Sequence, residues 1–113
     1  MTAAIAGEIG GELASALDKF VAGGAGRAAA AYRCGPMSVC VRFVDPTFDG
    51  ADLETRVVDV YDTILAEVDA EERDDIIQVL AFTPKESRTL GVSLLFDEGF
   101  ERARTRPELL EVA

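Results

Sequence analysis

The chain has 113 residues, of which 49% are hydrophobic, 21 are acidic and 11 are basic, and it contains no histidine. This length suits a single domain over residues 1–113, and the net charge of −10 disfavours binding to nucleic-acid phosphates. No apolar run is long enough to span a membrane and no secretory signal is present, so we expect a cytoplasmic domain with neither a nucleic-acid nor a membrane partner.

Residues 1–22 predict an N-terminal helix. Apolar side chains recur there at spacings of four and three, which places them on one helical face: Ile5, Ile9, Leu13, Leu17 and Phe20. Glycines in the same segment weaken a helix, so we expect this apolar face to be stable only when it packs against another surface. Ile5, Ile9 and Leu13 are therefore candidate protein-binding residues. Residues 23–36 follow as a Gly/Ala-rich joint, in which 28–32 favour one or two further helical turns.

Residues 37–97 predict a strand–helix–strand–strand core. Residues 37–44 alternate apolar and polar side chains, as a strand does, and residues 53–68 carry apolar side chains at helical spacing. Residues 76–83 are apolar on both faces, which is typical of a central strand, and residues 90–96 read as a strand hairpinned to it. Residues 98–113 form a charged tail, with a short helix as far as Arg104 and disorder up to Pro107 and beyond as the two alternatives.

The resulting fold class is α+β, with element order helix–strand–helix–strand–strand. One crossover helix between two strands favours a parallel pair, to which the third strand adds antiparallel. We therefore expect a mixed three-stranded sheet with helices packed on it. Such a small sheet leaves open edges, so pairing with a second copy or with another chain is a plausible consequence.

The loop of residues 45–52 is the richest candidate for a ligand site. It follows a strand and opens a helix, which is where open α/β sheets place ligands. Asp45, Thr47, Asp49 and Gly50 match the first half of a calcium-binding loop, but the twelfth position, where a glutamate is expected, is Arg56. Asp45 and Asp49 are thus candidate metal ligands, and the alternative is that they serve as turn and capping residues.

No catalytic residue and no cofactor are predicted. Histidine, the commonest general base, is absent, and no phosphate-binding glycine motif is present. Cys34 and Cys40 lack the spacing of a redox CxxC pair, and two thiols alone do not make a structural zinc site. They read as free thiols, with a regulatory disulfide as the alternative. A binding role is therefore favoured over catalysis.

Asp97, Glu98 and Phe100 are the remaining candidate protein-binding residues, because a surface that mixes acidic and aromatic side chains suits a basic partner with an apolar centre. Phe100 could equally fold back on the core. The leading hypothesis is a small acidic protein-binding or regulatory module, a profile of size and charge that inhibitors and immunity proteins share. The alternatives are a self-associating domain that forms a homo-oligomer, and a small ligand- or metal-binding domain that uses the 45–52 loop.

Overall fold

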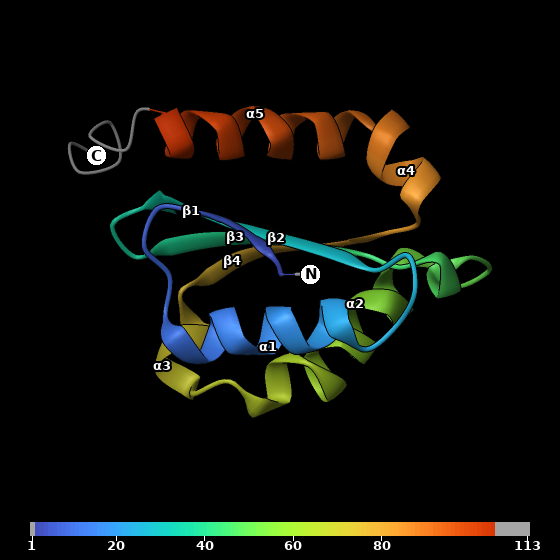
Figure 1. The fold of residues 1–113 in the computed structure, drawn as a ribbon, viewed down its shortest axis with the longest axis horizontal. Helices are drawn as coiled ribbons and strands as arrows, with labels where there is room; N and C mark the ends of the chain where they lie inside the picture. The colour runs from blue at the N-terminus through green and yellow to red at the C-terminus, as the bar shows by residue number, and fades with distance from the viewer. Residues whose placement is uncertain (1, 106–113) are drawn as a thin grey trace.

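A computed structural model describes residues 2–105, which form a mixed four-stranded sheet with helices on both faces (Figure 1). The strands lie in the order β1-β2-β3-β4, with β1 and β2 parallel, β2 and β3 antiparallel, and β3 and β4 parallel. The elements are β1 (Ala4–Ala6), α1 (Gly11–Ala22), β2 (Ala28–Gly35), β3 (Ser38–Val44), the 3-10 turn η1 (Pro46–Phe48), α2 (Leu53–Thr63), the 3-10 turn η2 (Leu65–Glu67), α3 (Ala70–Asp74), β4 (Ile76–Phe82), α4 (Pro84–Thr89) and α5 (Gly91–Thr105).

The larger core lies between the sheet and the layer formed by α1 and α2 (Figure 1). Leu13, Leu17 and Phe20 point from α1 into this core, and the ring of Phe20 meets Phe43 of β3 edge-to-face at 5.0 Å. The side chain of Glu72 in α3 accepts a hydrogen bond from the backbone N of Leu13, so it satisfies a donor in the first turn of α1. This hydrogen bond joins α3 to the beginning of α1.

A smaller core lies on the opposite face, under α5. Phe96 and Ala103 of α5 are buried against Tyr32 of β2, and the rings of Tyr32 and Phe96 meet at 5.0 Å. Arg42 of β3 crosses to α5, where it stacks on the Phe96 ring and pairs with Asp97 at 2.7 Å. This helix therefore makes the sheet the middle of three layers. None of the helices in residues 2–105 has both the length and the apolar character needed to cross a bilayer.

The α+β class and the mixed sheet agree with the sequence analysis, as do the strand at β3, the helix at α2 and the strand at β4. The expected N-terminal helix is wrong at its beginning. Ala4–Ala6 pairs with β2 as a short strand, and Gly7, at a φ of +77°, turns the chain toward α1. Ile5 and Ile9 therefore do not share a helical face with Leu13. A glycine is favoured at Gly7 because this φ is strained for other residues.

The Gly/Ala-rich joint is also wrong, since β2 occupies its second half and forms an antiparallel hairpin with β3. Its alanines have high helix propensity, but small side chains let both α1 and α5 approach the sheet, and pairing with β3 outweighs the propensity. The expected three-stranded sheet thus has four strands.

The segment 90–96, expected to be a hairpin strand, instead opens α5. Its buried positions Ser93, Phe96 and Ala103 follow helical spacing. The chain is turned toward this helix by α4, which begins with Pro84 at its first position and a reciprocal capping box between Thr83 and Glu86. The charged tail expected from residue 98 continues α5 to Thr105, and residues 106–113 lie outside the described part. As a result, no strand follows β4 in the part of the chain that the structure describes, and β4 forms an edge of the sheet there.

Gly99 sets how closely α5 approaches the sheet. A Cβ added there would lie 2.6 Å from Cζ and 3.0 Å from Cε2 of the Tyr32 ring. We predict that Gly99→Ala lowers the free energy of unfolding by about 1–2 kcal/mol, because overpacking against Tyr32 exceeds the gain in helix propensity. Denaturant-induced unfolding of wild type and variant measures this change in the free energy of unfolding. Gly91→Ala, where the added methyl meets open space, is the control, and equal stability of the two variants would contradict the close contact.

Candidate functional site

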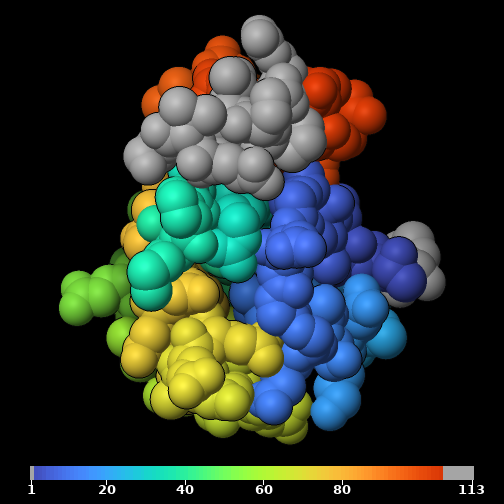
Figure 2. Space-filling view, turned by 90° about the vertical axis from the view of Figure 1, so that its left-hand side faces the viewer, coloured from blue at the N-terminus to red at the C-terminus, as the bar shows by residue number. Residues whose placement is uncertain are grey.

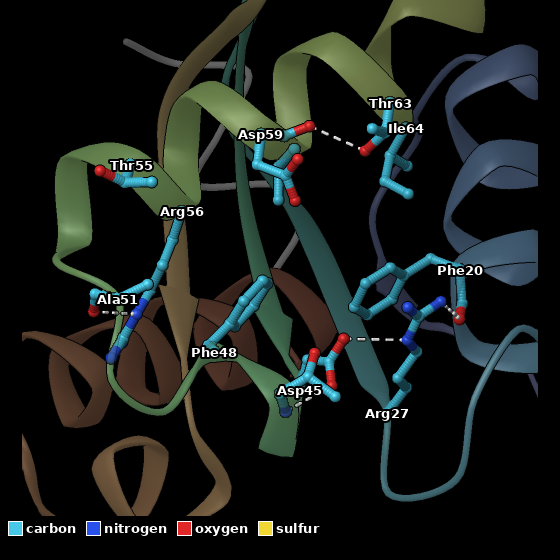
Figure 3. A pocket seen from close by; sticks show the side chains of 12 residues that line it. Phe20, Arg27, Asp45, Phe48, Ala51, Thr55, Arg56, Asp59, Thr63 and Ile64 are labelled. Carbon is cyan, nitrogen blue, oxygen red and sulfur yellow. Dashed lines mark hydrogen bonds and ion pairs between the residues drawn. The ribbon is translucent and has the colours of Figure 1, made fainter.

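A pocket of about 240 Å³ lies at the carboxyl end of β3, between η1, α2 and the end of α1 (Figure 3). Phe20 and Phe48 form its aromatic walls, and Asp45 and Arg27 form its polar floor. Figure 3 shows Asp59 and Thr63 of α2 on the far side of the opening. This is the place where the sequence analysis expected a ligand site.

The carboxylate of Asp45 is used by the protein itself. Only 2% of the residue is exposed. Its Oδ2 accepts from Arg27 Nε at 2.9 Å and its Oδ1 accepts from the backbone N of Thr47 at 2.9 Å, which starts η1. Arg27 also donates to the Phe20 carbonyl and stacks over the Phe20 ring. Asp45 therefore acts as a buried cap that connects the β3 end to the α1–β2 loop.

The second metal candidate, Asp49, is exposed at the end of η1, where its backbone N bonds to the Pro46 carbonyl. Among residues 2–105, no three acidic or cysteine side chains are grouped so that they could hold a metal ion. The Asp45 side chain caps η1, whereas Asp49 takes part in the turn through its backbone N–H, and the side chain that caps α2 is Asp52.

Arg56 is the most heavily engaged side chain near the pocket. It is 5% exposed and donates to the carbonyls of Ala51 and Ala81 at 2.9 and 3.2 Å and to the Glu86 carboxylate at 2.6 Å. Glu86 in turn accepts from the backbone N of Thr83. One guanidinium thus joins the start of α2, the end of β4 and the first turn of α4. The residue that breaks the calcium-loop pattern is a structural connector.

The pKa of Glu86 is held below its ordinary value of 4.5, first by the hydrogen bond from Arg56 and then by that from Thr83. We predict that Glu86→Gln lowers the free energy of unfolding at neutral pH by about 2 kcal/mol, because it removes the charge that faces a buried guanidinium. Because the folded-state pKa is depressed, this contribution is complete above pH 4.5 and is lost as the pH falls through the folded-state value.

Unfolding curves of wild type and Glu86→Gln across this pH range measure the effect, and their difference must shrink toward acid pH. Glu98→Gln, on an exposed turn of α5, is the control and should leave stability nearly unchanged. A difference between wild type and Glu86→Gln that stays constant down to strongly acid pH would contradict the ion pair.

Cys34 and Cys40 lie together across the β2–β3 hairpin, with the Cys40 thiol donating to Cys34 Sγ at 3.1 Å. Burial, followed by the hydrogen bond and charge of Cys40, raises the pKa of Cys34 to about 12. Since the thiolate is the reactive form, the raised pKa makes the Cys34 thiol a poor nucleophile at neutral pH.

The candidate protein-binding residues do not form one surface. Leu13 is buried in the larger core, Ile9 packs partly against it and Ile5 is exposed on β1. Phe100 packs against Tyr32 in the smaller core with ring centroids 6.4 Å apart. Asp97 and Glu98 are exposed on α5, and Asp97 pairs with Arg42.

The feature that the sequence analysis missed is the open edge of β4. Within residues 2–105, β4 pairs with β3 alone, and the other edge of the sheet is the three-residue β1. The strand order places β4 at the edge of the sheet opposite β1, and Figure 2 shows gold residues on the left of the molecule and most of the dark-blue N-terminal residues on the right. Residues 76–83 contain no charge, no proline and no glycine. Natural edge strands usually carry such protective residues, so this edge is unusually exposed to pairing.

A groove of about 270 Å³ runs beside this edge. Its floor is the second half of β4, and its walls come from both helical layers, with Leu53 and Val57 from α2 and Val92 from α5. Ile77, at the start of the strand, is 64% exposed. The same strand therefore carries an exposed apolar side chain, Ile77, near its start and an apolar groove beside its second half. The uncharged run was visible in the sequence, but its place at an edge was not.

Comparisons of the chain with protein-family models, with curated proteins and with solved structures find no match.

Proposed function

We propose that this protein is a binding module that accepts a strand of a protein partner along the edge of β4. The observation that carries the proposal is an uncharged edge strand that, within residues 2–105, pairs with β3 on one side only and is flanked by apolar side chains from both helical layers. An extended chain that adds to such an edge gains backbone hydrogen bonds, and its side chains gain contacts in the groove.

The backbone of β4 supports this reading. Asp45 N bonds to the Phe82 carbonyl, so Phe82 faces β3, and alternation along the strand turns Ala81 and Val79 outward. The outward carbonyl of Ala81 already accepts from Arg56. Val79 is left with both of its backbone groups available to a new strand.

The strongly acidic remainder of the surface complements this edge. Like charges on two molecules oppose contact, so a net charge of −10 suppresses association wherever the surface is charged. An uncharged strand is the place where association is least opposed.

The test is a pull-down from lysate of the native cells, with wild type, Ile77→Lys and Met37→Lys as bait. Ile77 and Met37 are both exposed apolar residues, 64% and 74% exposed, and the two substitutions change the charge equally. We predict that Ile77→Lys loses a stoichiometric partner that wild type and Met37→Lys retain, since a lysine on the edge blocks strand addition.

Mass spectrometry identifies the retained protein, whether it is another chain or an untagged copy of this one. Equal capture by all three baits would contradict binding at β4, and so would capture of nothing by a wild type that is also monomeric.

A further inference from the structure

We infer that the occupant of the β4 edge is a second copy of this chain, paired antiparallel about a two-fold axis at Val79, with Ile77 of each copy seated in the groove of the other. This inference rests on the proposed function, because it names the partner of the same edge. Three features of the described residues carry it: the backbone register, the shape of the edge and the distribution of charge.

The register follows from which backbone groups are free. The β3–β4 pairing shifts between Val39 and Cys40, so Ile77 has no partner residue on β3. Because Arg56 holds the Ala81 carbonyl, Val79 is the centre of the open stretch. Two copies that meet at Val79 exchange both of its hydrogen bonds, as directly opposed residues of an antiparallel pair do.

The shape of the edge is self-complementary in that register. A two-fold axis at Val79 places Ile77 of one copy opposite Ala81 of the other. Ala81 lines the groove that Leu53, Val57 and Val92 enclose. The exposed Ile77 side chain therefore enters an apolar groove of about 270 Å³, and the same contact is made twice.

Charge at the two ends of β4 points to the antiparallel direction. Asp74 and Asp75 precede the strand, and Lys85 and Arg88 follow it. In the described residues, neither basic side chain makes an ion pair or hydrogen bond, whereas most other arginines and lysines are engaged within the chain. Antiparallel pairing brings the basic end of one copy to the acidic end of the other. Parallel pairing would set like charges together.

Sedimentation of the full-length chain across the micromolar range tests the dimer. Wild type should reach twice the monomer mass of 12.1 kDa, and both Val79→Pro and Ile77→Lys should remain monomeric. Proline at Val79 removes an outward N–H and leaves the bonds to β3 in place, so the variant keeps its fold. Unfolding curves should show that Val79→Pro is folded. Met37→Lys, the control, should dimerise like wild type.

A charge exchange tests the direction of pairing. Lys85→Glu with Arg88→Glu makes one variant, and Asp74→Lys with Asp75→Lys makes the other. Each alone should raise the dimer Kd about fivefold or more, because like charges meet at both ends. An equimolar mixture should form a heterodimer about as tight as wild type, since the two-fold geometry restores both opposite-charge contacts.

The outcomes separate this inference from the proposed function. A monomeric wild type that still captures another protein through Ile77 would overturn the second copy and leave strand acceptance standing. A monomer that captures nothing would overturn both. A dimer that survives both Val79→Pro and Ile77→Lys would place self-association on another face, and a mixture that fails to form the heterodimer would overturn the antiparallel register.

Discussion

The Arg56 guanidinium is the interaction on which the rest of this structure depends. It is buried and holds the carbonyl of Ala51 before α2, the carbonyl of Ala81 at the end of β4 and the carboxylate of Glu86 in α4. A buried cation is tolerated only when its donors are paired, so these three segments are fixed relative to one another. Through Glu86 the same group supports the capping box that turns the chain from the sheet toward α5. This residue therefore helps to fix the point at which the chain leaves β4 for the opposite face of the sheet.

Charge is distributed so that the protein has few places at which it can associate. Buried cations are matched inside the fold, as in the pairs of Arg27 with Asp45 and Arg56 with Glu86. The excess of acid lies outside, where it opposes contact between copies. The uncharged β4 edge, with Asp74 and Asp75 at one end and Lys85 and Arg88 at the other, is the part of the described surface where attraction and shape agree. The proposed binding edge is thus separate from the acidic part of the surface.

Sequence reasoning found the elements whose patterns are local. β3 alternates, α2 has apolar side chains at helical spacing, and β4 is an uncharged run in which Gln78 is the one polar residue. It failed where tertiary contacts determine the secondary structure of a segment. The alanines of β2 favour a helix until a hairpin with β3 is available, and β1 is too short to show a period. The apolar run that opens α5 fits a strand as well as a helix until its buried positions at Ser93, Phe96 and Ala103 are known. The candidate site was hidden for the same reason, because β4 is an edge only if α5 is not a strand.

Amide hydrogen exchange at Val79 tests the central claim most directly. The account predicts that the Val79 amide exchanges rapidly in dilute protein and becomes protected as the concentration rises, whereas the amide of Leu80, which faces β3, is protected throughout. A Val79 amide whose exchange is independent of concentration and of any captured partner would contradict it, because the edge of β4 would then not be the surface through which this protein binds.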